Sequence, residues 1–337
     1  MLQEIIIPEF RNSAGTVQKI ALTYQVFGQP LGTAPIVLVN HSLTGNSQVT
    51  GEQGWWNSIV GPKKCLDTEI FSILCFNIPG NGYDDKKENL IHNYREFTLQ
   101  DIARTFLTGL KELGITRLFA AVGGSIGGAV VWELAALQPG LIENLIPIAT
   151  DYKATDWVLA HCKVQDQILN NSVTPVQDAR QHAMTFYRTP QSFTQKFRRT
   201  KNEVSLEFNI HSWLSHHGEK LEKRFQLASY KLMNHLLTTI DISAGTGGYL
   251  DTAAKIEGNI HIVTIDSDWF FLAEENWETY VELSLLKNNI SINEIKSIHG
   301  HDAFLIENRQ LSRFLKPIFQ QERLKNEENK YRTLWNG

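Results

Sequence analysis

The sequence predicts an α/β fold in which a mostly parallel sheet carries helices on both faces and receives a helical lid. Two observations predict it. Short apolar runs alternate with helical runs through residues 1–150, which is the pattern of a doubly wound sheet. That alternation stops near residue 151, gives way to helical patterns, and resumes near residue 244. We therefore expect a core built from residues 1–150 and 244–337, interrupted by a lid of residues 151–243.

The composition is that of an ordinary globular protein and excludes several classes of function. The 337 residues are 42% hydrophobic and 20% charged, which is enough apolar material for a large core. A formal net charge of −4 gives no general attraction to nucleic acid or to anionic membranes. No run of about 18 apolar residues occurs and the N-terminus lacks a basic segment, so we expect neither a membrane span nor a signal peptide. The three cysteines lack the spacing of a metal site and fit a reduced, cytoplasmic protein.

The first part of the chain predicts the strands that open the sheet. Residues 4–7 and 20–27 alternate partly between apolar and polar side chains, which favours an antiparallel pair at the sheet edge. Residues 35–39 and 71–76 are apolar runs typical of buried parallel strands. The first of these two runs leads into a polar, glycine-containing loop over residues 40–46. Such a loop lies at the carboxyl edge of the sheet, where open α/β folds place their sites.

A helix is expected to begin after Thr98, because a threonine followed three residues later by Asp101 can form a capping box. Its apolar residues recur at helical spacing until Gly114 ends it. Further strands are expected over residues 118–122 and 145–150.

The lid is predicted to be helical. Its expected helices cover residues 157–169, 175–187, 192–199 and 219–240. Its histidines lack the spacing of metal ligands except at the adjacent His216 and His217, which do not face one ion well, so we expect no metal. After the lid we expect a strand at 259–265, a helix at 275–287, a last strand at 292–295 and a charged tail from Gln320.

The stretch Gly123–Gly128 carries the pattern Gly-x-Ser-x-Gly between a predicted strand and a predicted helix over residues 129–137. A serine on so sharp a turn needs neighbours almost without side chains, and glycine supplies the backbone angles and the close approach. The turn would expose the Ser125 hydroxyl and aim the positive end of the helix at it, which suits a developing oxyanion. Because glycine-rich turns of this kind also cradle phosphates, the residues that follow must decide between the two functions.

An acid and a histidine follow the serine in the order that a Ser-Asp-His triad on such a sheet requires. Asp266 and Asp268 follow the next-to-last strand, and His299 and His301 follow the last one. We favour Asp268, because Asp266 still continues its strand, and we favour His301, which the glycine before it presents on a loop. The histidine would take the serine proton, and the acid would orient the imidazole and stabilise its charged form.

Four stretches of the chain resemble the homoserine O-acetyltransferase family, a branch of the α/β-hydrolase superfamily. They are Asn40–Gly45, Gly123–Gly128, Asp266–Phe270 and Gly300–Leu305. A weaker likeness runs from Ser212 to Tyr230 within the lid, and another covers residues 54–62.

This resemblance implies an α/β-hydrolase fold and a set of catalytic roles. Ser125 would be acylated by acetyl-CoA, with Asp268 and His301 completing the triad. The backbone N–H groups of Leu43 and Ile126 would form the oxyanion hole.

The same resemblance implies three substrate-binding residues. Arg224 would pair with the substrate carboxylate, Asp302 would receive the substrate ammonium group, and Tyr230 would line the site. The chain departs from the family at three places. Ile126 replaces a usual methionine, which matters little for a backbone donor. Residues 79–87 replace a longer glycine- and serine-containing loop, and residues 226–228 lack the acid and the asparagine that follow the family's arginine.

We therefore expect a two-step acyltransferase of methionine biosynthesis, with acetyl-CoA as co-substrate, L-homoserine as acceptor and no permanently bound cofactor. The alternative is a serine esterase that uses water as acceptor with the same triad. A third hypothesis is a binding protein that keeps the fold without catalysis, which an intact triad order disfavours. The apolar residues of the lid leave room for homodimer contacts, and the compositional argument places the protein in the cytoplasm.

Overall fold

The computed structural model describes residues 1–245 and 247–320, and its main feature is one mixed sheet. Within those residues the sheet has eight strands in the order β1-β2-β6-β3-β7-β8-β9-β10. The strands are β1 (Gln3–Arg11), β2 (Val17–Gly28), β3 (Ile36–Asn40), β6 (Ser72–Phe76), β7 (Leu118–Gly124), β8 (Ile142–Ile148), β9 (Asn259–Ile265) and β10 (Ile290–Ile295). β2 pairs antiparallel with β1 and with β6, and the remaining pairs are parallel. The predicted fold class, a mostly parallel sheet with helices, is confirmed.

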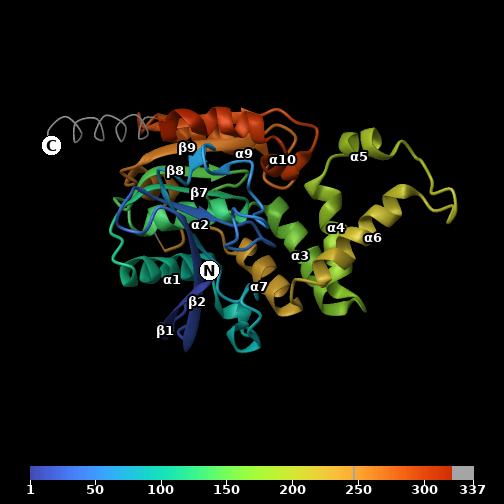
Figure 1. Cartoon of the computed structure of the whole chain (residues 1–337), viewed down its shortest axis with the longest axis horizontal. Coiled ribbons are helices and arrows are strands. Elements are labelled where there is room, and N and C mark those ends of the chain that lie inside the picture. Colours follow the sequence, from blue (N-terminus) through green and yellow to red (C-terminus); the bar gives the residue numbers. More distant parts are fainter. Residues whose placement is uncertain (246, 321–337) are drawn as a thin grey trace.

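Helices cover both faces of this sheet, as Figure 1 shows with α1 below it and the red C-terminal helical segment above it. α1 (Leu99–Glu112) and α2 (Ile126–Leu137) pack into one apolar core, and a helical segment over residues 308–320 packs into the other. Strand side chains alternate between the two cores: in β3, Leu38 faces the first, whereas Val37 and Val39 face the second. Both faces of the central strands are therefore buried.

The start and end of α1 follow the predicted signals. The Thr98 side chain accepts from the backbone N–H of Asp101, and the Asp101 carboxylate accepts from the backbone N–H of Thr98, so the capping box is confirmed. Gly114, just past the helix, has a φ of +68° that favours glycine. Two short strands, β4 (Val60–Gly61) and β5 (Leu66–Asp67), form a small separate sheet that the sequence did not predict.

Helices fill the chain between β8 and β9. They are α3 (Asp156–Asn171), α4 (Pro175–Tyr187), α5 (Pro190–Phe197), α6 (Asn209–Glu222) and α7 (Leu227–Thr238), followed by the short α8 (Tyr249–Ala254). In Figure 1, α4, α5 and α6 lie to one side of the sheet. The division into a core and a lid of residues 151–243 stays a prediction.

One predicted helix is wrong in its extent. The single helix expected over residues 219–240 is two helices, because the chain turns between Glu222 and Leu227. Phe225 in that turn is 5% exposed and packs against Tyr230, with ring centroids 6.0 Å apart. Burial of this ring, together with the extended backbone of Gln226, interrupts the helical periodicity.

The end of the chain follows the predicted order more closely. α9 (Ala273–Ser284) precedes β10, and the short α10 (Ala303–Ile306) follows it. The charged tail predicted from Gln320 lies almost entirely outside the described residues. In the part of the chain that the structure describes, no helix is long and apolar enough to cross a membrane. The same residues contain no group of three or more metal-ligating side chains placed to hold an ion.

Candidate active site

Ser125 stands on a strained turn between β7 and α2. Its backbone has φ 58° and ψ −130°, a conformation that costs a residue with a side chain of the order of 1–3 kcal/mol. The backbone N–H of Ser125 donates to the carbonyl oxygen of Ile148 at 2.9 Å, which ties the turn to β8. The side chain is 4% exposed and, within the described residues, makes no hydrogen bond. The fold therefore holds a hydroxyl group in a costly but defined position, free to act on a substrate.

The glycines around this serine are required by close packing. A Cβ atom on Gly124 would lie 2.4 Å from the ring of Phe304. One on Gly127 would lie 2.6 Å from the carbonyl oxygen of Asn40. These contacts bring the loop after β3 and the helix after β10 directly against the turn, so three distant segments meet at Ser125.

His301 and Asp268 form a buried pair. The His301 Nδ1–H donates to Asp268 Oδ2 at 2.6 Å, and both residues are 3% exposed. The other carboxylate oxygen, Oδ1, accepts from the backbone N–H groups of Phe270 and Phe271 at 2.7 and 3.1 Å. Because Nδ1 carries the shared proton, Nε2 is the nitrogen left to accept a proton from a nucleophile.

Four aromatic rings surround His301, and the sequence analysis did not predict them as part of the site. Tyr187 and Phe270 lie 5.4 Å from its ring centroid, and Phe271 and Phe304 lie 5.8 Å from it. Such a wall excludes water from the imidazole and fixes the plane of its ring. Only Tyr187 comes from the helical segment between β8 and β9. It is the last residue of α4, and no sequence motif marks it as part of the site.

The competing candidates point elsewhere. Asp266 Oδ1 accepts from the backbone N–H of Ser297 at 3.0 Å, and its Oδ2 lies 3.8 Å from Lys296 Nζ. His299 Nδ1 accepts from the Arg188 guanidinium at 3.0 Å. Of the two acids and two histidines weighed from the sequence, the structure brings together Asp268 and His301.

The loop after β3 supplies one of the two predicted oxyanion donors. The backbone N–H groups of Leu43 and Ile126 donate to no protein acceptor within the described residues. Neighbouring His41 anchors the loop, because its Nδ1–H donates to the carbonyl oxygen of Ser42 at 2.8 Å while its Nε2 accepts from the N–H of Ile78 at 3.0 Å. Burial lowers the pKa of His41 to about 4, so this histidine is neutral and acts as a tether.

Two of the predicted substrate residues, both from the helical segment between β8 and β9, lie near the loop after β3. Arg224 donates through one guanidinium nitrogen to the carbonyl oxygen of Thr44 at 2.8 Å, next to the oxyanion loop. Arg224 is exposed as a residue, but desolvation of its guanidinium, and then the charge of Arg180, lower its pKa. Tyr230 is 1% exposed, and burial raises the pKa of its hydroxyl to about 12.

Asp302 has a neighbour that the sequence analysis missed. Its Oδ2 lies 3.8 Å from the guanidinium of Arg188, and the two side chains are 19% and 14% exposed. Burial raises the pKa of Asp302, while the charges of Arg180, His301 and Arg188 oppose the rise. This acid therefore already has a cationic partner, and its role toward a substrate ammonium group stays a prediction.

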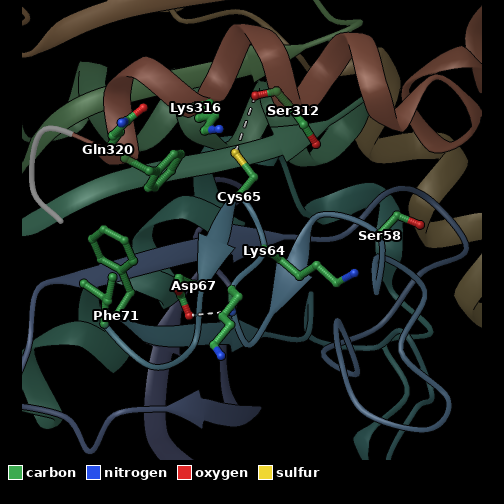
Figure 2. A pocket seen from close by; sticks show the side chains of 11 residues that line it. Ser58, Lys64, Cys65, Asp67, Phe71, Ser312, Lys316 and Gln320 are labelled. Carbon is green, nitrogen blue, oxygen red and sulfur yellow. Dashed lines mark hydrogen bonds between the residues drawn. The ribbon is translucent and has the colours of Figure 1, made fainter.

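A cavity of about 590 Å³ lies away from these residues (Figure 2). Lys64 and Cys65 line it from one side, and Lys316 and Gln320 of the C-terminal helical segment line it from the other. None of the candidate catalytic residues borders it. Large volume alone therefore does not mark the site, and the buried residue pair does.

Comparison with known proteins identifies the family of the chain. Residues 35–307 match the family model described as the alpha/beta hydrolase fold. The homoserine O-acetyltransferase of Salinibacter ruber is 30% identical over 91% of this chain and 94% of its own length. That of Trichormus variabilis is 29% identical over 92% of this chain and 90% of its own.

Solved structures agree on the fold. The homoserine O-acetyltransferase from Bacillus anthracis superposes with a TM-score of 0.85 at 17% identity, covering 95% of this chain and 97% of its own. Esterase E22 superposes with a TM-score of 0.83 at 16% identity, covering 95% and 100%. Since one fold carries both a transferase and an esterase at similar distance, the fold does not choose between them.

Proposed function

Because this chain belongs to the α/β-hydrolase fold family, and within it to the homoserine O-acetyltransferase family, we propose that it transfers an acetyl group from acetyl-CoA to the hydroxyl group of L-homoserine. The product, O-acetyl-L-homoserine, would serve methionine synthesis. The cytoplasmic location and the homodimer expected from the sequence stay predictions.

The first half-reaction would acylate the enzyme. Ser125 Oγ attacks the thioester carbonyl carbon while His301 Nε2 takes the hydroxyl proton. The carbonyl oxygen becomes an oxyanion, which the N–H groups of Leu43 and Ile126 stabilise. Collapse of this intermediate breaks the carbon–sulfur bond, and the protonated imidazole gives its proton to the departing thiolate. Asp268 holds the imidazole in the required tautomer throughout.

The second half-reaction would release the acyl group to the acceptor. The hydroxyl of L-homoserine attacks the acetyl carbon of the acyl-serine, and His301 Nε2 takes its proton. The same two N–H groups stabilise the second oxyanion. When that intermediate collapses, the Ser125 oxygen leaves and takes the proton back from the imidazole, so the free enzyme is restored.

The placement of Arg224 is the observation that carries this proposal. Its guanidinium holds the carbonyl of Thr44, the residue after the predicted oxyanion donor Leu43. A guanidinium has five N–H donors, so one bond to the loop leaves others for a carboxylate. An amino-acid acceptor could thus be anchored beside the acyl carbon, which an enzyme that uses water would not need.

A serine esterase is the second candidate, and the pairing of Asp302 with Arg188 favours it. An acid already balanced by a nearby guanidinium offers a weaker site for a substrate ammonium group. Residues 226–228, where the family typically carries an acid and an asparagine, contain no acid and so leave this region with one negative charge fewer.

Release of free CoA from acetyl-CoA separates the two candidates. The purified protein is assayed with and without L-homoserine, and with L-serine as an acceptor one methylene shorter. The transferase predicts release that depends on homoserine and disappears in Ser125→Ala. Release at the same rate without an acceptor would contradict transfer and support the esterase.

A further inference from the structure

A small, partly open cavity lies beside the candidate active site. It offers about 10 Å³ to the centre of a water molecule, which is room for about one water or methyl group. Leu43, the predicted oxyanion donor, forms part of its wall, as do Tyr187 and Phe270. Those two rings also contact the His301 imidazole, each with centroids 5.4 Å apart. The cavity therefore adjoins the place where an acyl group on Ser125 would lie.

The rest of the wall includes two polar atoms without partners and one leucine. Gln165, on α3, is 4% exposed, and its Nε2 donates to the carbonyl oxygen of Ala179 at 3.1 Å and to His182 Nδ1 at 2.9 Å. These bonds fix the amide, since the reverse orientation would set two oxygens together. Gln165 Oε1 and His161 Nε2 then have no hydrogen-bond partner among the described residues. Leu237, on α7, is 1% exposed and lines the same cavity.

We propose that this cavity is the blind end of the acyl pocket, and that Leu237 and Gln165 set the length of acyl group that the enzyme accepts. The inference rests on the proposed function in one respect, because it takes Ser125 as the acylated residue. An acetyl group ends at or before the cavity, whereas a longer chain must fill it. There an added methylene meets the Leu237 side chain and covers Gln165 Oε1, which then stays buried without a partner.

Acyl groups that end in a carboxylate are excluded by charge as well as by size. No lysine or arginine is among the residues that line the cavity. Burial lowers the pKa of both His161 and His182, so neither carries a positive charge at neutral pH. The nearby cation is Arg180, whose guanidinium carbon lies 5.7 Å from the ring centroid of Tyr187, outside the cavity lining. A carboxylate placed in the cavity would therefore lose its hydration without a direct ion pair to replace it. The pocket therefore suits a short, neutral acyl group.

The test compares p-nitrophenyl acetate, propionate and butyrate as acyl donors, because these esters report acylation of Ser125 without any acceptor. For the wild-type protein we expect kcat/KM to fall about tenfold or more with each added methylene. Leu237→Ala should raise the butyrate-to-acetate ratio about tenfold. Gln165→Met, which keeps the length of the side chain but removes the unpartnered oxygen, should raise the propionate-to-acetate ratio about tenfold.

Leu236→Ala is the matched control, because Leu236 lies on the same helix, is equally buried and does not line the cavity. It should destabilise the protein by a similar amount and leave both ratios unchanged. Each ratio is taken on a single preparation, so partial unfolding of a variant cancels out. A smaller truncation, Leu237→Val, covers the case in which the alanine variant does not fold.

Equal rates for acetate and butyrate in the wild-type protein would overturn the inference, as would equal shifts for Leu236→Ala and Leu237→Ala. Failure of the proposed function looks different. If CoA release does not depend on homoserine, transfer is contradicted. The kcat/KM ratios of the esters still test the role of the cavity in that case. Absence of a covalent acyl adduct on Ser125, measured by intact-protein mass spectrometry with every ester, would contradict both.

Discussion

Two regions of the molecule owe their structure to different kinds of contact. One is the turn at Gly123–Gly128, which we call the elbow, and the other is the helical segment Asp156–Thr238, which we call the insertion. At the elbow, local chemistry dictates the backbone, because glycine flanks the serine and a Cβ atom at Gly124 or Gly127 would meet other atoms within 2.6 Å. In the insertion, contacts distant in sequence help to set the structure. In the turn that divides one expected helix into two, Arg224 donates to the carbonyl oxygen of Thr44.

This difference separates chemistry from selectivity. Under the proposed function, the elbow, the loop after β3 and the Asp268–His301 pair would acylate Ser125 whatever the acceptor is. The insertion contributes Arg224, Tyr187 and the cavity wall at Gln165, which we propose select the acceptor and the acyl group. Changes at the elbow should therefore abolish turnover for every substrate, and changes in the insertion should alter preference among substrates.

The largest expected effect tests the group formed by the elbow and the Asp268–His301 pair. Asp268→Asn should lower kcat roughly 10³- to 10⁴-fold with p-nitrophenyl acetate and with acetyl-CoA alike, because the amide no longer holds the catalytic tautomer of His301. Asp266→Asn removes the competing acid, which contacts Lys296, and should change kcat less than about threefold. Equal losses, or the reverse ranking, would show that the wrong acid has been assigned.

A second prediction tests whether packing, rather than the serine alone, makes the elbow work. Gly124→Ala should lower kcat roughly 100-fold. Its Cβ would push the Phe304 ring aside, and that ring packs against the His301 imidazole. The double variant Gly124→Ala/Phe304→Leu should recover at least part of that loss. Phe304→Leu alone is the control. A double variant no better than Gly124→Ala would mean that the methyl group acts through another contact.

The same contrast explains what could be predicted from the sequence. The strands, the capping box at Thr98 and the Ser125 turn were predictable, because each depends on neighbouring residues. The choice of Asp268 and of His301 needed only the chain order and the place of each residue on its loop, and the structure brings these two together.

The rest depends on contacts that no local pattern encodes. The pairing of Arg188 with Asp302 joins positions more than 100 residues apart, and nothing around Arg188 marks it. The buried ring of Tyr187 follows an ordinary helical pattern, so the sequence alone predicted only a helix end there. The split between α6 and α7 was missed for the same reason, since Leu221 and Leu232 fit either one helix or two.

A third prediction tests the insertion. Arg224→Lys should raise the KM for L-homoserine roughly tenfold while leaving acylation by p-nitrophenyl acetate within about twofold, because an ammonium cannot hold the Thr44 carbonyl and a carboxylate in the geometry of a guanidinium. Lys223→Ala, at the exposed neighbouring position, serves as the control and should change neither value. Equal losses with L-homoserine and with p-nitrophenyl acetate would instead show that Arg224 positions the loop that carries Leu43 and Thr44.

The smallest expected effect on turnover concerns the junction between the two regions. Glu133 on α2 is fully buried, and burial raises its pKa to about 7, with the charge of Asp241 just beyond α7 adding to the rise. The folded state therefore holds a proton that the unfolded chain has released once the pH exceeds about 4.5. Unfolding free energy should fall as the pH rises from about 4.5 to 7, and stay level above that range.

Glu133→Gln removes this titration. It should leave kcat unchanged, match the wild-type stability near pH 4.5, and exceed it by roughly 3 kcal/mol at pH 8, as measured by urea unfolding at both pH values. Glu112→Gln, at an exposed site on α1, should show no such pH dependence. A stability gain at pH 4.5 equal to that at pH 8 would attribute the effect to packing of the amide. A gain confined to pH 8 would show that burial of Glu133 carries an electrostatic cost in α2, near Asp241, whereas Ser125, the proposed nucleophile, precedes the first residue of the same helix.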